Sequence, residues 1–565
     1  MLRYASMFGR ALTAAMASAG RAWRDCLLVA GRIALAGRPV LPRKERGSSA
    51  LVLSLLLIGG CSTPRIERPS TPSYALADAG PTALGRASAG EARLHPGMSG
   101  FRLIVASREA FSTRAVLTDL AERTLDLQYY SAADDLTTDL LLLRLDGAAQ
   151  RGVRIRILLD DIHPSSRRFA QRARSLHPDT QVRLYNPFFW SDRWDPLRVG
   201  ELIADADRLN RRMHHKLWIT DNAAAIVGSR NLGDAYFDGL ESGNFSDIDL
   251  LAIGPIVNEL SQAFDVYWNS ASAVPIENLA ESPDADHGER LRQSLRARAA
   301  VCEDTPSCAS LVPPTLQGEA DWLQPKIGSL VWAMPELSYD PPEEEKSSVP
   351  SGIEHGWIED RPGGAQTQSE LLIISPYLLF GDDGLSHLAD MRRRGIRVAV
   401  LTNSLASTDS LAAHAGYARQ RTALLSNGVE LFEMRPQTDL KHGRTHRWLR
   451  AEAGSLHAKI IVQDRARAIV GSLNQDPRSR LHNREMWLTV RSTDLAVELA
   501  ALFDEASDKH HAYKVELVTR GDAQWLEWHT EESGRMVVHA VEPGASPWHK
   551  FWRAVLGALI PEDLL

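Results

Sequence analysis

One short motif occurs twice in this chain, and its duplication constrains the fold more than any other feature. Each copy has a His, a Lys two residues later, an Asp five residues after the Lys, and a downstream Gly-Ser-x-Asn turn. The copies are His214, Lys216, Asp221, Gly228, Ser229 and Asn231, and His457, Lys459, Asp464, Gly471, Ser472 and Asn474. At average residue usage, six fixed residues have a chance on the order of 10⁻⁸ per start position. The chain is therefore built from two copies of one folding unit.

The segments that precede each motif also repeat. Strand-like stretches lie at residues 125–130, 151–160 and 182–187 in the first half, and at 371–377, 394–403 and 429–433 in the second. A Leu-rich helical stretch occupies residues 136–150. Strands that alternate with helices are typical of layered α/β folds. We therefore predict the α/β class, with similar domains at residues 101–274 and 366–535 and an insertion or linker at 275–365.

The repeated side chains suit chemistry on a phosphodiester. Side chains alternate along a strand, so the His and Lys of each motif share one face. One His can form a covalent intermediate on phosphorus while the other protonates the departing oxygen, and two Lys can neutralise the phosphate oxygens. We expect the turn residues to hydrogen-bond the same phosphate, with simple turn formation as the alternative for Gly and Ser. No Cys, His or carboxylate set has metal-ligand spacing, so neither a metal nor a cofactor is expected.

These residues resemble those of the phospholipase D superfamily, in which two HxKxxxxD motifs meet at one site between two similar α/β domains. Further segments resemble bacterial cardiolipin synthases of the C type. They are residues 207–214, 233–237, 402–406, 414–419 and 476–479. The resemblance implies a phosphatidyltransferase that makes cardiolipin from phosphatidylglycerol and a second phospholipid, with phosphatidylethanolamine as a candidate, through a phosphohistidine intermediate.

The resemblance also implies roles for individual residues. The catalytic residues would be His214, Lys216, Asp221, His457, Lys459 and Asp464, supported by Ser229, Asn231, Asp247, Ser472, Asn474 and Glu485. His214 is expected to attack phosphorus and His457 to act as acid and then base, although the near symmetry leaves the reverse assignment open. By position, Asp247 corresponds to the carboxylate that orients His214, with Asp249 as a weaker candidate. Glu485 corresponds to the one that orients His457. Such a carboxylate fixes the tautomer of its His and stabilises the charged form.

Three other functions remain open: a phospholipase D hydrolase that releases phosphatidic acid, a nuclease of the same superfamily, and a lipid-binding module without activity. The net charge is −7, and removing residues 1–60, with nine basic and two acidic residues, leaves 55 basic and 69 acidic residues. Such a chain lacks the broad positive field of a nucleic-acid binder. We therefore expect phospholipids and a membrane surface as partners, and no nucleic acid. The sequence leaves an activating protein partner open.

The N-terminal region predicts export. Residues 42–46 are mostly basic, residues 50–60 form a short apolar core, and Cys61 follows in a context that resembles the bacterial lipoprotein box. We therefore expect residues 1–60 to comprise an N-terminal extension and a lipoprotein-type signal peptide, and Cys61 to carry the lipid. No apolar run reaches the roughly 18 to 20 residues that a spanning helix needs, which argues against an integral membrane protein.

The residues after the signal peptide predict where the mature protein is located. Residues 61–100 are rich in Pro, Ser, Ala and Gly and are predicted to be a tether. Ser62, in place of Asp after the lipidated Cys, resembles sorting to the outer membrane, so we expect attachment by a lipid anchor on the periplasmic side. Cys302 and Cys308 then remain as an even pair, which predicts a disulfide, with two free buried thiols as the alternative.

Residues 536–565 are predicted to be a C-terminal amphipathic segment. Ser546 and Pro547 are favourable residues for starting a helix, and the following apolar residues share one helical face. They are Trp548, Phe551, Trp552, Val555, Leu556, Leu559 and Ile560. This helix is predicted to lie among lipid headgroups, with packing on the second domain as the alternative.

Other aromatic and basic residues leave two interpretations open. The aromatic residues 188–190 with Trp194 favour core packing over insertion at a lipid interface. Arg211 and Arg212 are either headgroup contacts or solvated side chains, and His414 is either structural or a headgroup contact.

Overall fold

The computed structural model describes residues 71–240, 243–280, 286–305, 308, 311, 326–342, 367–436 and 454–559. All of them belong to one compact unit, Glu67–Leu565. The predicted signal peptide and Cys61 lie outside the described residues and stay predictions. None of the helices in the described ranges combines the length and the hydropathy that a membrane crossing requires.

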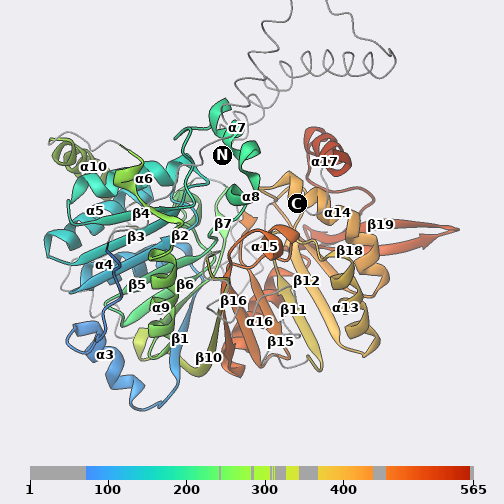
Figure 1. Cartoon of the computed structure of the whole chain (residues 1–565). Helices are drawn as coiled ribbons and strands as arrows, with labels where there is room; N and C mark the ends of the chain where they lie inside the picture. The colour runs from blue at the N-terminus through green and yellow to red at the C-terminus, as the bar shows by residue number, and fades with distance from the viewer. Residues whose placement is uncertain are drawn as a thin grey trace, which may run out of the picture. The chain divides into compact units, whose positions relative to one another are not determined.

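The first domain is a mixed sheet with helices on both faces (Figure 1). Its elements are α3 (Ala83–Ala92), β1 (Ser99–Ile104), α4 (Ser107–Leu120), β2 (Thr124–Tyr129), α5 (Leu136–Gln150), β3 (Arg154–Asp160), α6 (Pro164–Leu176), β4 (Gln181–Tyr185), α7 (Pro196–Ala204), α8 (Ala206–Leu209), β5 (Lys216–Thr220), β6 (Ala224–Gly228), β7 (Phe245–Ser246), β8 (Asp249–Ile253), α9 (Ile256–Trp268) and β9 (Ala273–Pro275). The strand order is β9-β4-β3-β2-β5-β6-β8-β1, with β2, β3 and β4 parallel and the other neighbours antiparallel. Helices α4, α5 and α6 pack on one face and α9 on the other.

The second domain repeats this arrangement. Its elements are β11 (Glu370–Ile374), α13 (Gly381–Arg393), β12 (Arg397–Asn403), α14 (Leu411–Ser426), β13 (Glu430–Met434), β14 (Ser455–Leu456), β15 (Ile460–Gln463), β16 (Arg467–Gly471), α15 (Pro477–Leu481), β17 (Met486–Arg491), α16 (Thr493–Ala506), β18 (Ala512–Arg520), β19 (Ala523–Glu532), β20 (Arg535–His539) and α17 (Pro547–Leu559). The order β13-β12-β11-β15-β16-β17 matches β4-β3-β2-β5-β6-β8, and β18 to β20 extend its outer edge. The predicted α/β class with two similar domains is confirmed.

The strand boundaries differ from the predicted ones where a glycine ends the preceding helix. Helix α5 occupies the predicted residues, but β3 begins at Arg154 rather than at residue 151. Gly152 has a φ of +87° and Gly395 a φ of +85°, a left-handed conformation that only glycine adopts without strain. In both domains the chain therefore turns at this glycine before the next strand begins.

The two sheets are joined by a strand that lies within the predicted linker. Strand β10 (Val331–Tyr339) pairs antiparallel with β1 of the first domain and with β17 of the second. An apolar core is also shared, because residues of β5 and β6 cluster with residues of β15 and β16. Residues 275–365 also contribute α10 (His287–Glu303) and a disulfide between Cys302 and Cys308, whose Cα atoms are 5.1 Å apart. This region is therefore more than a linker, because it fixes one domain to the other.

Candidate active site

Each motif histidine is held at the domain boundary by a backbone hydrogen bond to the opposite domain. The His214 N–H donates to the Arg484 carbonyl at 2.8 Å, and the His457 N–H donates to the Ser246 carbonyl at 2.9 Å. Strands β7 and β14 also form a parallel pair across this boundary. Both histidines are buried, and the charges of His457 and Lys459 reach His214. The two motifs therefore meet at one site between the domains.

The carboxylates that orient the histidines are exchanged between the domains. His214 Nδ1 lies 2.8 Å from Glu485 Oε2, and His457 Nδ1 lies 2.7 Å from Asp247 Oδ2. The predicted pairing, Asp247 with His214 and Glu485 with His457, is therefore wrong. The cause is the backbone pairing across the boundary, since each carboxylate directly follows the residue whose carbonyl binds the opposite histidine. The weaker candidate Asp249 binds Arg114 at 2.9 Å and orients neither histidine.

The serines of the turns support these carboxylates. The Ser472 hydroxyl donates to Glu485, and the Ser229 hydroxyl donates to Asp247. We predicted that these serines would bind the substrate phosphate, but their hydroxyls are already engaged in the structure. Each half of the site is therefore a buried chain of His, carboxylate and Ser in which the His and the Ser come from different domains.

The two asparagines of the turns are buried beside these chains. Asn231 Nδ2 donates to the Tyr236 hydroxyl at 3.0 Å. The side-chain oxygens of Asn231 and Asn474 are buried without a hydrogen-bond partner among the described residues. A buried amide oxygen is an unusual group to leave unpaired, and it can accept a hydrogen bond from a substrate hydroxyl. The predicted contact of these residues with the phosphate itself stays a prediction.

The two motif lysines are buried next to the histidines. Lys216 Nζ donates to the His214 carbonyl at 2.6 Å, and Lys459 Nζ donates to the His457 carbonyl at 2.6 Å. Burial lowers the pKa of Lys459 to about 8 and the pKa of Lys216 well below its ordinary value. A phosphate that enters the site would reverse this effect, because an anion stabilises the charged form of a buried amine. Both lysines are therefore suited to neutralise a phosphodiester.

The motif aspartates have a structural role at the opposite ends of the motif strands. The Asp221 carboxylate accepts the backbone N–H groups of residues 122–124 at 2.8 to 2.9 Å, and the Asp464 carboxylate accepts those of residues 368–370 at 2.7 to 3.0 Å. Both aspartates have a φ of +53°, at the turn that follows the strand. Their prediction as catalytic residues is corrected, because each carboxylate is fully used in holding the start of β2 or β11.

The carboxylates of the two His–carboxylate pairs have pKa values shifted in opposite directions. Burial raises the pKa of Glu485 to about 7. Burial opposes the ionisation of Asp247 too, but its ion pair with His457 holds its pKa well below the usual range. Burial lowers the pKa of both histidines, and it lowers that of His214 more strongly. The site therefore favours a neutral His214, while a permanent anion lies next to His457.

Residues that the sequence analysis did not assign complete the walls of the site. The ring of Tyr130 contacts the His214 ring edge-on at 4.8 Å, and the rings of Tyr236 and Phe245 lie 5.3 and 5.1 Å from the His457 ring. The Arg478 guanidinium contributes to the lowered pKa of His214. Tyr236 and Arg478 belong to segments that carry the family resemblance, and Tyr130 ends the strand predicted at residues 125–130.

Two further candidates have structural roles. His414 is buried, and its Nε2 lies 3.0 Å from the Arg421 guanidinium, so it is not placed to contact a headgroup. Arg212 is also buried and donates to the carbonyls of Leu209 at 2.6 Å and Asn186 at 2.9 Å. These residues hold α14 and the segment before His214 in place.

Two histidines, two lysines and two oriented carboxylates in one buried interdomain site define an enzyme of the phospholipase D type, which acts on phosphodiesters. Comparisons with known proteins specify the family. The family model described as "Cardiolipin synthase, PLD-like domain" matches residues 117–268 and 365–507. The chain belongs to this family, and the predicted class, a phospholipase D-superfamily transphosphatidylase, is confirmed.

Relatives and a solved structure agree with this membership. The chain is 35% identical over 484 residues to Cardiolipin synthase C of Escherichia coli (strain K12), covering 83% of this chain and 97% of that protein. It is 28% identical over 490 residues to an uncharacterized protein of Helicobacter pylori (strain J99), covering 85% and 90%. The crystal structure of phosphatidylserine synthase from Haemophilus influenzae Rd KW20 aligns with a TM-score of 0.51 at 13% identity, covering 85% of this chain and 100% of that one. This last likeness concerns the fold alone.

Proposed function

We propose that the protein transfers a phosphatidyl group from one phospholipid to a hydroxyl group of phosphatidylglycerol and so makes cardiolipin. The observation that carries this proposal is the interdomain site, in which each histidine has a carboxylate from the other domain and a buried lysine beside it. The 35% identity to Cardiolipin synthase C supports the choice of product. Phosphatidylethanolamine is one candidate for the donor.

We assign His214 as the nucleophile and His457 as the general acid and base. His214 is held neutral by burial, and its Nδ1 faces Glu485, which leaves Nε2 free to attack phosphorus. His457 lies against the anionic Asp247, which stabilises the protonated imidazole that a general acid needs. The opposite pKa shifts of the two carboxylates therefore support the assignment that sequence symmetry left open.

The reaction then has two steps. In the first, His214 Nε2 forms a bond to the donor phosphorus, the bond from phosphorus to the headgroup oxygen breaks, and His457 gives its proton to that oxygen. In the second, a hydroxyl of phosphatidylglycerol loses its proton to His457 and attacks phosphorus, and the bond from phosphorus to His214 breaks. The two lysines stabilise the charge on the non-bridging oxygens in both steps.

The products formed from defined lipids test this proposal. Purified protein is given phosphatidylglycerol with and without phosphatidylethanolamine, and the lipids are measured by mass spectrometry. We expect cardiolipin, and a stimulation by phosphatidylethanolamine would identify the donor. Phosphatidic acid in place of cardiolipin would indicate a hydrolase, and cleavage of DNA without lipid turnover would indicate a nuclease. The surface variant His287→Ala serves as a control with normal activity.

We also propose that the mature protein is attached to the periplasmic side of the outer membrane by acyl chains on Cys61. The sequence around Cys61 supports this, and the disulfide between Cys302 and Cys308 agrees with an oxidising compartment. Cys61→Ala should release part of the protein from the membrane fraction, since each acyl CH₂ contributes about 0.8 kcal/mol to membrane binding. Intact residues 1–60 on the cellular protein would contradict this placement.

A further inference from the structure

Helix α7 has its charged side chains inside and its apolar side chains outside. Arg198 and Glu201 are buried, with exposed fractions of 0% and 3%. Five large apolar residues of α7 and of the loop before it are exposed: Trp190 46%, Trp194 45%, Leu197 59%, Val199 44% and Ile203 76%. Leu202 is half-buried. A surface helix of a protein in water has the opposite arrangement, with its apolar face against the core. We call these five exposed residues the α7 face.

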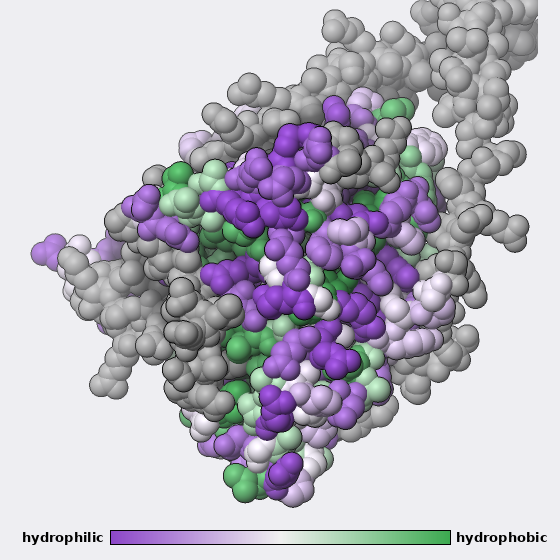
Figure 2. Space-filling model, turned by 90° about the vertical axis from the view of Figure 1, so that its left-hand side faces the viewer, coloured by the Kyte–Doolittle hydropathy of each residue, from purple (hydrophilic) through white to green (hydrophobic). Residues whose placement is uncertain are grey.

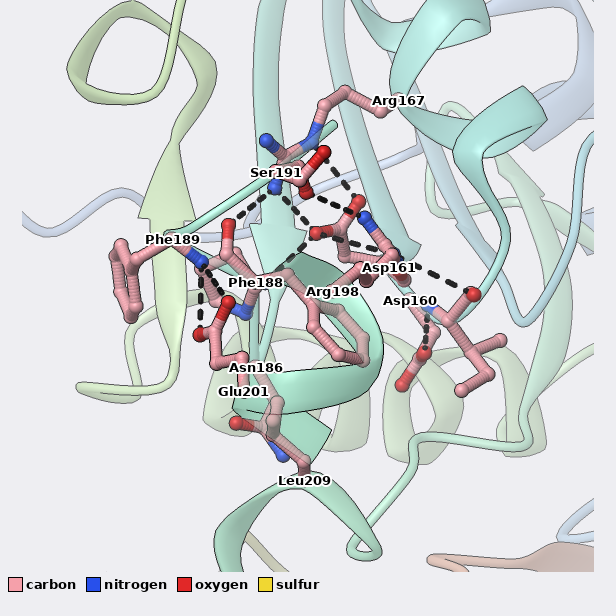
Figure 3. Close-up of polar contacts among 12 residues, drawn as sticks. Asp160, Asp161, Arg167, Asn186, Phe188, Phe189, Ser191, Arg198, Glu201 and Leu209 are labelled. Atoms are coloured by element: carbon pink, nitrogen blue, oxygen red, sulfur yellow. Dashed lines mark hydrogen bonds and ion pairs between the residues drawn. The ribbon is translucent and has the colours of Figure 1, made fainter. Parts of the chain in front are cut away.

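The buried side of α7 is held by a polar network (Figure 3). Arg198 donates to the Ser191 carbonyl at 2.9 Å. Glu201 accepts the backbone N–H groups of Phe189 at 2.9 Å and Trp190 at 2.8 Å. Both buried charges thus have hydrogen-bond partners in the chain that leads into the helix, which favours this orientation of α7.

Asp161 also holds the loop before α7 and Arg198 of the helix in place. Its carboxylate accepts the Phe188 N–H at 2.8 Å and the Arg167 guanidinium at 3.1 Å, and its carbonyl accepts a hydrogen bond from Arg198. The Arg198 guanidinium also lies 3.8 Å from the centre of the Phe188 ring. Turning α7 over would break the contacts of Arg198 with the Asp161 carbonyl and the Phe188 ring. The outward direction of the apolar side chains is therefore built into the fold.

We propose that the α7 face docks on the phospholipid bilayer that contains the substrates. This inference rests on the proposed function, because a phosphatidyl donor and a phosphatidylglycerol acceptor both keep their acyl chains in a bilayer. The fixed Leu, Val and Ile side chains enter the acyl region, and Trp190 and Trp194 lie at the level of the headgroups, which tryptophan favours.

The position of the α7 face favours a bilayer. Helices α7 and α8 directly precede His214 in the chain, and Arg208 of α8 binds Glu201 at 3.3 Å, so the face is linked to the segment that leads to His214. Helix α17 lies at the same end of the molecule (Figure 1) and also exposes aromatic rings, Trp548 at 63% and Phe551 at 53%. By contrast, the face of the molecule that is on the left in Figure 1 is covered mainly by hydrophilic residues (Figure 2). The exposed apolar side chains of α7 and α17 therefore gather at one end of the molecule, as docking on a flat bilayer requires.

Turnover on vesicles compared with turnover in detergent tests the proposal. The full chain is assayed on vesicles of phosphatidylglycerol and phosphatidylethanolamine, and on the same lipids dispersed in detergent. We expect Ile203→Asp to lower turnover on vesicles roughly tenfold, because a charge replaces an inserted apolar side chain, and to leave turnover in detergent unchanged. The control is Val301→Asp on α10, where the valine is similarly exposed at 68% but lies off the α7 face. It should behave like the unmodified protein on both substrates.

Hydrogen exchange gives a second readout that does not depend on activity. Vesicles should slow the exchange of backbone amides in residues 189–204 and leave residues 287–303 unchanged. If this protection appears and no lipid is turned over in any form, docking stands and the proposed function fails. Absence of protection, equal loss of turnover on both substrates, or a change in oligomeric mass caused by Ile203→Asp would each overturn the docking proposal.

Discussion

The two halves of the active site contain the same kinds of residue, but the pKa values of their carboxylates are shifted in opposite directions. His214 pairs with Glu485, whose pKa burial raises to about 7, whereas His457 pairs with Asp247, whose pKa lies well below its usual range. The surroundings differ as well. The charge of Arg478 acts on His214, and two aromatic rings contact His457. A duplicated motif has therefore produced two histidines that are not equivalent.

This difference shows how a symmetric fold can carry out an asymmetric reaction. A nucleophile needs a neutral imidazole, and a general acid needs a protonated one. A carboxylate that can itself take up a proton stabilises an imidazolium less than one that stays ionised. We propose that the Glu behind one histidine and the Asp behind the other separate their roles, and the following predictions test this separation.

The largest effect is expected from replacing the histidines one at a time. His214→Ala should form no phosphoenzyme. His457→Asn should accumulate one from a donor whose leaving group needs no proton, because the attacking nitrogen remains but the second step lacks its base. Each change should lower turnover by roughly 10²–10⁴-fold. Intact-protein mass spectrometry at neutral pH, after a single turnover of a soluble phosphatidyl donor, measures the intermediate. A phosphoenzyme on the His214→Ala variant alone would reverse the assignment.

A smaller and unequal effect is expected from neutralising the carboxylates. Asp247→Asn should lower kcat by roughly 10³-fold, because the acid histidine loses its permanent anion. Glu485→Gln should lower it by about 10²-fold, since a carboxyl with a pKa near 7 is already partly protonated. Steady-state kinetics, with circular dichroism to check folding, measures both. Equal losses would contradict the proposed division of roles.

The pH dependence of kcat/KM sharpens the same comparison. Below a pH of about 7 Glu485 gains a proton and donates it to His214 Nδ1, which places the imidazole proton on Nε2 and blocks attack. Activity should therefore rise as the pH increases through about 7. It should fall above about 8, where Lys459 loses its charge. Glu485→Gln should remove the rise at low pH, and a profile unchanged by this substitution would assign the rise to another group.

The motif aspartates should differ in their contribution to stability. Asp221 is fully buried and Asp464 is partly exposed, although each accepts three backbone N–H groups. Asp221→Ala should lower the free energy of unfolding by about 2–4 kcal/mol and Asp464→Ala by about 1–2 kcal/mol. Urea unfolding measures both changes. Because neither carboxylate touches the reacting atoms, the protein that remains folded should retain its activity.

The smallest effect is expected at α17 of the second domain. The helix is confirmed from Pro547, and Ser546 caps it by accepting the His549 N–H at 3.2 Å. Trp548 is exposed and Trp552 is half-buried on a helix that packs on α14. Trp548→Glu should lower turnover on vesicles about two- to threefold, and Trp552→Glu should lower the melting temperature. If Trp552→Glu lowered turnover on vesicles and Trp548→Glu lowered the melting temperature instead, Trp552 would face the membrane and Trp548 would be the packed residue.

Much of the fold followed from local patterns in the chain. The repeated strands, helix α5 and the start of α17 were readable because hydrophobic periodicity and capping residues act over a few positions. The joining strand β10 was missed, since its only distinguishing property is that it pairs with one strand of each domain. Nothing in the sequence of β10 identifies β1 and β17 as its partners.

The motif determined which residue types form the active site, and only the tertiary structure decided how they are paired. Position along the chain suggested Asp247 for His214, but the backbone contacts with Arg484 and Ser246 exchange the carboxylates between the domains. The same distinction holds for α7, whose amphipathic pattern is identical whether its apolar side faces the core or the solvent. The physical reason is that a sequence pattern records spacing within one segment. Pairing and burial depend on which segments, distant in the chain, come to lie against each other.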